Sequence, residues 1–448
     1  MKQASLYQSI FFAIITKLFL AIVFTCAFAV TAGSQDLYIA RQQAAIKMKN
    51  DISAAPASYS KKRFWRAAGE WALVQLVPWA SNRYIRKAPF AKISIKRIQH
   101  NLDVNSLEWD DNKFLTNQFS HPLQGSLYFV AFRSNGYNFW QSASAALAGS
   151  FVWETVCETH VPAPNDLINT TLGGMVLGEM SYRLANRIFS KKTAAGYGNA
   201  APLTIVTDAG TRLINMTKDK FGHSKAEAFT RICLQYGDPF ANDKKPFSNF
   251  SVIMEAGNSD SAKINTLQIE GSLYGKKIKQ DDNSVHSFNV SMKYQFFQNS
   301  SFVYGAQSVR FNLFSKYHLS HNLEIQFSTG TGVLLLAAVQ NRHMCYGEGR
   351  NYDYCLGLNF HAGIGISIGN KLFYNFNYNM EGFKTVNGYQ SSHSSYSSSS
   401  AIRWVVFKNL SITASTDIYH FNGFYKMYSD ISEHFQFRYF GLGYKIDL

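Results

Sequence analysis

Four ionisable side chains near the middle of the chain have types and spacing that suit acid–base chemistry: His121, Glu154, Glu158 and Asp166. An imidazole beside a carboxylate can transfer a proton at neutral pH, and a second carboxylate can orient the imidazole. One candidate site is therefore His121 with one of the three carboxylates as a general acid–base pair. The alternative is a hydrogen-bonded polar plug, in which the same side chains only fix the register of packed helices.

Metal coordination by these residues has less support from the sequence. A histidine with carboxylates can bind a metal ion, but the chain contains no HExxH motif or comparable fixed ligand spacing. The acidic segment 103–111 can supply carboxylates to Ca²⁺, yet its irregular spacing favours a solvated turn. We therefore predict no metal site, and the sequence does not indicate a cofactor.

Three helices are needed to bring the four side chains together. Pro122 suits the first turn of a helix, and Gly136 suits its left-handed end. Asn138 can cap a second helix that runs to about Glu158, and a third helix begins after the break at 160–164. Short connections make consecutive helices antiparallel, so the start of the first, the end of the second and the start of the third should meet.

The two glutamates need compensation at their predicted position. Glu154 and Glu158 would lie on one face near the C-terminal end of a helix. Their mutual repulsion and the helix dipole both disfavour carboxylates there. The candidates for this compensation are Lys113, Arg133, a metal ion, or protonation of the carboxylates with a raised pKa.

Short motifs across the same stretch resemble those of a known family. They are a Trp-Asp lead-in, Asn-Gln-Phe-x-His-Pro-x-x-Gly, Ser-Asn-Gly-x-Asn-Phe-Trp, Trp-Glu, Asn-Asp-Leu and Gly-Gly-x-x-x-Gly-Glu, at Trp109–Asp111, Asn117–Gly125, Ser134–Trp140, Trp153–Glu154, Asn165–Leu167 and Gly173–Glu179. The stretch is similar to the bacterial domain of unknown function three-nine-four-three. This resemblance implies an outer-membrane-associated protein without an assigned reaction.

The first 32 residues have the pattern of a secretory signal peptide. Lys2 and Lys17 are basic, residues 18–29 are apolar, and residues 30–32 supply small side chains for cleavage. The mature chain should then begin near Gly33. A retained membrane anchor is the alternative, because the apolar run is near spanning length.

Residues 33–108 form a basic lead-in. Positions 33–100 hold 13 Lys and Arg but only 3 Asp and Glu, in a chain of net charge +15. No nucleic-acid motif occurs, so we expect anionic lipid as the partner of this charge. One helical face would be apolar and either lies in a membrane interface or packs on the helical bundle. It comprises Phe64, Trp65, Ala68, Ala72, Leu76 and Trp79.

The second half of the chain has a sequence period of two. In residues 287–296 apolar and polar side chains alternate strictly, which is typical of a half-buried strand. We count ten such strands, with twelve as the upper limit. They lie near 248–257, 265–276, 286–297, 302–315, 322–339, 355–368, 371–381, 393–407, 409–420 and 434–448.

The connections between these strands favour a transmembrane β-barrel. Very short turns alternate with longer connections, and only 16% of the chain is charged, which is little for a soluble surface. A soluble β-sandwich or lipocalin-like barrel is the alternative. Outer-membrane barrels usually finish on an aromatic residue, whereas this chain ends in Leu448, which departs from the signal for barrel insertion.

Four cysteines follow the predicted signal peptide, as expected for an oxidising compartment. Cys345 and Cys355 bracket the longest strand-free connection, so we predict a disulfide between them. The state of Cys157 and Cys233 stays open.

These patterns predict an α+β chain with four parts: a signal peptide (1–32), the basic lead-in (33–108), a three-helix module (109–198) and an antiparallel transmembrane β-barrel of about 10–12 strands (199–448). We expect an outer-membrane protein with a structural, receptor, small-solute or lipid-binding role. Its helical module would be periplasmic, or would cap or plug the barrel. Expected partners are membrane lipids and the barrel-insertion machinery, not nucleic acid. The alternative is a membrane-surface enzyme that acts on lipid or envelope substrates through the His/carboxylate cluster.

Overall fold

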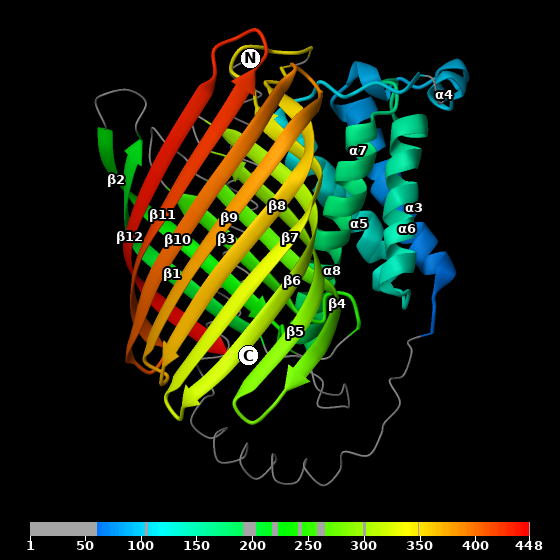
Figure 1. Ribbon diagram of the computed structural model, residues 1–448. Helices are drawn as coiled ribbons and strands as arrows, with labels where there is room; N and C mark the ends of the chain where they lie inside the picture. Colours follow the sequence, from blue (N-terminus) through cyan, green and yellow to red (C-terminus); the bar gives the residue numbers. More distant parts are fainter. Residues whose placement is uncertain are drawn as a thin grey trace. The chain divides into compact units, whose positions relative to one another are not determined.

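Twelve antiparallel strands close into a barrel in the computed structural model. The structure describes residues 61–103, 106–190, 203–216, 223–240, 244–257, 265–298, 302–347 and 349–447, so the predicted signal peptide lies outside the described residues. Figure 1 shows the strands side by side round the barrel. They are β1 (Leu203–Met216), β2 (His223–Tyr236), β3 (Phe250–Gly257), β4 (Asn265–Gln280), β5 (Ser284–Gln298), β6 (Val303–Ser320), β7 (Leu323–Gln340), β8 (Tyr352–Ile368), β9 (Leu372–Asn387), β10 (Ser391–Phe407), β11 (Leu410–Tyr425) and β12 (Ile431–Asp447).

Each strand pairs with its neighbours in sequence, and the first strand closes the barrel on the last. β1 pairs with β12 from Thr204 opposite Asp447 to Met216 opposite Phe435. Closure leaves no free sheet edge, which is the condition for a barrel to cross a membrane. The predicted fold class is confirmed, with the strand count at the upper end of the predicted range.

The sequence pattern did not reveal β1 and β2. The outward positions of β1 include Thr207 and Ala209, which contrast little with the polar inward positions. The inner face of β2 also weakens the pattern, because it carries the apolar Phe229 beside Arg231, which forms ion pairs with Glu255 (2.8 Å) and Asp417 (2.7 Å). Strands with weakly contrasting faces are the hardest to recognise from alternation alone.

The outer face of the barrel carries large exposed apolar side chains. In β12, Phe440, Leu442 and Tyr444 point outward, whereas Phe437 and Tyr439 point inward and are buried. The same outward face continues round the barrel through Phe311, Leu313, Phe327, Val333, Leu358, Phe360, Met380, Ile402 and Trp404, all exposed. A contiguous exposed apolar surface of this kind marks contact with a membrane or another apolar partner.

The three predicted helices are present, each extended by a π-helical turn. The first is η4 (Thr116–Ser120) with α5 (His121–Arg133), the second is α6 (Phe139–Val152) with η5 (Trp153–Cys157), and the third is α7 (Pro164–Ile168), η6 (Asn169–Gly173) and α8 (Gly174–Ser190). Before them lie α3 (Phe64–Ala80), η1 (Ser81–Ile85), η2 (Pro89–Ala91) and α4 (Ile95–Asn101). Among the described residues, no helix has both the length and the apolar composition needed to cross a membrane.

Local sequence signals fix the ends of these helices. Gly136 takes a φ of 89°, as predicted for a left-handed helix end. Asn138 caps α6, because its side chain accepts the backbone N–H of Gln141 at 3.0 Å and the Gln141 side chain accepts the Asn138 N–H at 3.2 Å. This reciprocal pair satisfies two N–H groups that the helix itself leaves free.

Glycines let the helices approach closely. A Cβ atom at Gly125 of α5 would lie 1.8 Å from the carbonyl oxygen of Thr170, and one at Gly174 would lie 2.7 Å from the Gly125 Cα. Any side chain at either position would push α5 away from the third helix. The small-residue faces of the sequence therefore serve backbone packing.

The helices contact the outer face of the barrel wall. Tyr294 of β5 shares the outward face with Val290, whose β6 partner Phe311 is 49% exposed. Tyr294 donates a hydrogen bond to the carbonyl of Gln118, and the rings of Phe114 and Phe296 pack at 5.4 Å. The sequence did not predict these contacts, because an apolar strand face has the same pattern whether lipid or a helix covers it.

Candidate functional site

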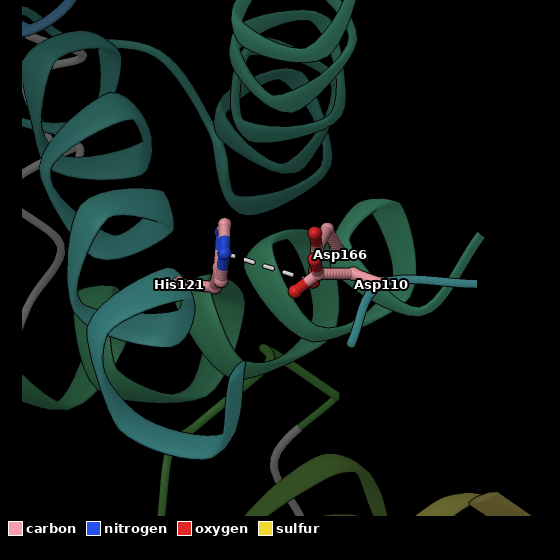
Figure 2. A group of neighbouring side chains, drawn as sticks. All are labelled: Asp110, His121 and Asp166. Carbon is pink, nitrogen blue, oxygen red and sulfur yellow. Dashed lines mark ion pairs between the residues drawn. The ribbon is translucent and has the colours of Figure 1, made fainter. Parts of the chain in front are cut away.

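The helix ends meet as predicted, and they bring His121 and Asp166 together. The Nε2 atom of His121, at the start of α5, lies 3.6 Å from Oδ1 of Asp166 in α7. Asp110, from the segment before α5, joins them, and one ligand atom from each of the three residues lies within 4.8 Å of the others. Figure 2 shows the three side chains converging. The sequence interpretation had placed Asp110 in a solvated turn and so missed it.

Neighbouring amides and a hydroxyl hold the three side chains in place. Asp110 receives the side-chain N–H of Asn112 on Oδ1 at 3.0 Å and donates its own backbone N–H to the side-chain oxygen of Asn165, also at 3.0 Å. Asn165 in turn donates to Oδ1 of Asp166 at 2.7 Å. The Nδ1 atom of His121 faces the Thr170 hydroxyl at 3.4 Å. These contacts fix the orientation of every member of the cluster.

Glu154 lies beside this cluster and is 2% exposed. One of its oxygens accepts the backbone N–H of Ala163 at 3.3 Å, while Oε1 is buried without a hydrogen-bond partner among the described residues. Burial raises the pKa of Glu154 well above its usual value, and the charges of Glu158 and Asp166 raise it further. Protonation with a raised pKa was one of the predicted forms of compensation.

The other two ionisable groups respond to the same environment. Burial raises the pKa of Asp166 well above its usual value, and the charges of Asp110 and Glu158 add to the effect. Burial lowers the pKa of His121 to about 4, although the charge of Asp110 opposes this. The imidazole is therefore neutral at pH 7.

Arg133 does not compensate the glutamates of the second helix. Its guanidinium pairs with Glu179 of α8 at 2.7 Å, and Arg183 pairs with the same carboxylate at 2.9 Å. The backbone carbonyls of Glu154 and Glu158 instead accept the side-chain N–H groups of Asn101 at 3.3 and 3.2 Å. Asn101 thus satisfies the end of the second helix without neutralising its carboxylates.

The barrel lumen contains a second candidate site, which sequence reasoning did not place. It is a cavity of about 450 Å³ lined mainly by polar side chains. Cationic and anionic groups balance along its wall, which includes Arg231, Lys293, Arg310, Glu255, Glu270 and Asp417. Arg310 pairs with Glu270 at 3.3 Å, and Asn312 donates to the same carboxylate at 3.3 Å.

Aromatic side chains fill the lumen next to this cavity. Phe302, directly before β6, packs against Phe421 of β11 at 4.6 Å and Phe435 of β12 at 6.3 Å between ring centroids. β6 lies on the opposite side of the barrel from β11 and β12, so these ring contacts span the lumen. Phe383 stacks on the same Phe421 ring at 6.3 Å. A small cavity of about 80 Å³ lies beside these rings.

The four described cysteines are free, which corrects the predicted Cys345–Cys355 disulfide. Cys345 is exposed in the connection before β8. Cys355 is buried on the inner face of β8, where its thiol lies 3.7 Å from the Thr385 hydroxyl. Cysteine spacing along the sequence does not show which face of a strand a thiol occupies, and here the two thiols have different environments.

The closed meander of twelve antiparallel strands with an apolar outer face defines the class: a β-barrel of the outer-membrane type. Residues 106–206 match the family model called "Domain of unknown function (DUF3943)", so the chain contains this domain. The matched residues cover the candidate cluster and the three helices from η4 to α8, and the resemblance found in the sequence is confirmed. No curated protein matches the chain.

Solved structures similar to this chain include several barrels, all at low scores. The NanC porin gives a TM-score of 0.29 at 11% identity, over 54% of this chain and 100% of the porin. The KdgM porin gives 0.25 at 10% identity, over 53% and 98%. The translocator domain of the autotransporter NalP from Neisseria meningitidis gives 0.25 at 12%, over 60% and 96%. Scores this low support no inference, and the fold class rests on the strand pairing described above.

Proposed function

We propose that the protein is an outer-membrane β-barrel that binds a small polar solute in its lumen. The observation that carries this proposal is the polar cavity of about 450 Å³ enclosed by the barrel wall. Cavities of this size are typical of small-molecule sites. The exposed apolar band on the outer face supports a position in the membrane, and its insertion would use the machinery that assembles such barrels.

The aromatic contacts across the lumen favour binding over free diffusion. Phe302, Phe421 and Phe435 close the barrel at their level, so a solute in the cavity cannot pass without movement of these rings. Twelve strands enclose little free space once side chains fill it. The balance of charge on the cavity wall favours a neutral or zwitterionic solute over an ion, because no net charge selects for either sign.

Two adjacent serines of β10 offer a matched test. Ser399 lines the cavity, whereas Ser400 points to the outer face and contacts the Tyr374 hydroxyl. The full chain in detergent would be titrated calorimetrically with a hexose, a zwitterionic amino acid, a sugar acid and a polyamine. We expect the neutral or zwitterionic probes to bind, with Ser399→Phe weakening them by at least ~10-fold and Ser400→Phe having little effect. Equal affinities for both variants, or no binding by any probe, would refute the proposal.

A second proposal concerns α3, whose outward side chains indicate an anionic lipid surface. Trp65 is 85% exposed, and Leu73, Leu76 and Val77 are also exposed, while Trp71 packs on the bundle through a hydrogen bond to the Ala145 carbonyl. The helix therefore uses one face for the bundle and leaves an apolar face open beside basic residues at its start. Such a face suits a membrane interface that carries negative charge.

Quenching of Trp65 by brominated lipid tests this contact. We expect quenching in nanodiscs that contain anionic lipid, measured as the difference from the Trp65→Phe variant. Replacing Lys61, Lys62 and Arg63 with Gln should abolish it, whereas replacing Lys276, Lys277 and Lys279 with Gln should not. Quenching that is equal with purely zwitterionic lipid and in both triple variants would exclude an electrostatic contact.

A further inference from the structure

We propose that Asp110, His121 and Asp166 bind one divalent transition-metal ion, for which Zn²⁺ is taken as the example. The three side chains come from three separate segments, and their ligand atoms converge within 4.8 Å of one another. Figure 2 shows that they point toward a common space. This inference goes beyond solute binding in the lumen, and its outcome is independent of that proposal.

The spacing of the ligand atoms fits coordination. Two ligand atoms each about 2.1 Å from a tetrahedral Zn²⁺ lie about 3.4 Å apart. The Nε2 atom of His121 and Oδ1 of Asp166 lie 3.6 Å apart, which is longer than a good hydrogen bond but close to this value. A shift of a few tenths of an ångström would complete the geometry for these two ligands.

The surroundings of the cluster have the character of a second coordination shell. Each proposed ligand is held by a polar neighbour: Asn112 for Asp110, Thr170 for His121 and Asn165 for Asp166. The contact of His121 Nδ1 with the Thr170 hydroxyl leaves Nε2 free to bind the ion. Supporting contacts of this kind fix ring orientation and ligand basicity in metal sites.

Buried acceptor atoms without partners provide an independent reason to place a cation here. Oδ2 of Asp110 and Oε1 of Glu154 are both buried and lack a hydrogen-bond partner among the described residues. Glu154 itself is 2% exposed. Several carboxylates gathered in a dry site are costly unless a positive charge offsets them. A bound divalent ion would supply that charge.

The ligand set selects a class of ion. One imidazole with two carboxylates suits Zn²⁺, Mn²⁺ or Fe²⁺, whereas Ca²⁺ prefers six to eight oxygen ligands. Where such an ion keeps an open position, it can polarise a substrate or activate water. The proposal here is limited to binding.

The experiment is competition for Zn²⁺ between a chromophoric chelator and the full chain in detergent. We expect one Zn²⁺ per chain with higher affinity than for Ca²⁺. Asp110→Asn, His121→Gln and Asp166→Asn should each lower the affinity by at least ~100-fold, since loss of a direct ligand exceeds the effect of losing a supporting contact. His160→Gln, an exposed histidine of the same module, should bind as the wild type does.

Thermal unfolding provides the control for correct folding. Asp110→Asn removes one charge from the cluster and should leave the metal-free protein at least as stable as the wild type. Added Zn²⁺ should raise the Tm of the wild type but not that of the variant, because only the native site gains binding energy. A wild type that binds Zn²⁺ no better than the variant, gains no Tm or prefers Ca²⁺ would overturn the proposal.

Discussion

At the residue scale, the types and spacing of the side chains indicate which of them meet, whereas the burial and hydrogen bonds of each depend on the folded structure. His121 and Asp166 were expected together because short connections force three helix ends to meet, and they lie 3.6 Å apart. Asp110 was missed because nothing in the acidic segment before α5 shows that Asn165 binds its backbone. The predicted Cys345–Cys355 disulfide was wrong because the sequence does not show that the Cys355 thiol faces the inside of the barrel.

Thiol reactivity follows from these environments. Burial, with a further contribution from Glu158, raises the pKa of Cys157 to about 11, so its thiol stays protonated below that pH. We expect N-ethylmaleimide at pH 8 to modify exposed Cys345 at least ~100-fold faster than Cys157, because the thiolate is the nucleophile. The rate at Cys157 should rise as the pH approaches 11. Mass spectrometry of peptides measures both rates, and similar rates at pH 8 would contradict the buried position.

The Glu179 carboxylate tests the ion-pair network of the module. Its side chain is fully buried and pairs with Arg133 and Arg183. We expect Glu179→Ala to lower the free energy of unfolding by about 3–5 kcal/mol, because two guanidinium groups lose their shared partner. Arg66→Ala, which removes the more exposed pair with Glu70, should cost less than about 1 kcal/mol. Urea titration followed by tryptophan fluorescence compares the free energies of unfolding of the two variants. Equal losses would show that the buried ion pairs stabilise the protein no more than the exposed pair does.

At the element scale, period and caps predicted most of the secondary structure. Ten strands and three helices follow from alternation, from Pro122 and from the Asn138 cap, because these are local properties of the chain. β1 was missed because Thr207 and Ala209 weaken the contrast between its faces, and β2 because the apolar Phe229 lies on its inner face. The π-helical turns around Asn117, Glu154 and Thr170 were not predicted, since they arise from packing rather than from local propensity.

Two glycines of the module should respond oppositely to the same substitution. Gly125→Ala would place a methyl group against the Thr170 carbonyl, so we expect a loss of at least about 2 kcal/mol. Nothing lies within 4 Å of a Cβ at Gly69 in α3, so Gly69→Ala should stabilise the helix by about 0.5–1 kcal/mol. Chemical unfolding of both variants measures the difference. Similar stabilities would mean that α5 and the third helix do not approach as closely as described.

At the scale of the whole molecule, the sequence predicted a barrel but not what covers it. The alternation of short turns with longer connections indicated a closed barrel with an even number of strands. The contact between the helices and the outer wall could not be predicted, because Tyr294 and Phe296 read as membrane-facing residues in the sequence. The occluded lumen also escaped prediction, since it depends on Phe302 meeting Phe435 from the opposite side.

The natural thiol at Cys345 reports the orientation of the barrel. It lies in the long connection between β7 and β8, whereas Asn370 lies in the tight turn after β8. Since short turns face the periplasm in outer-membrane barrels, we expect a membrane-impermeant maleimide to label Cys345 on intact cells. A Cys345→Ser, Asn370→Cys variant should be labelled only after lysis. The reverse pattern would mean that the barrel has the opposite orientation.

Conductance across a planar lipid bilayer tests most directly whether this is a membrane barrel with a closed, solute-binding lumen. The wild type should insert without a steady current, because Phe302 and Phe421 block the lumen. The Phe302→Ala, Phe421→Ala double variant should produce discrete openings, which would also show that the barrel crosses the membrane. A large steady conductance of the wild type, or no current from the double variant, would contradict this account.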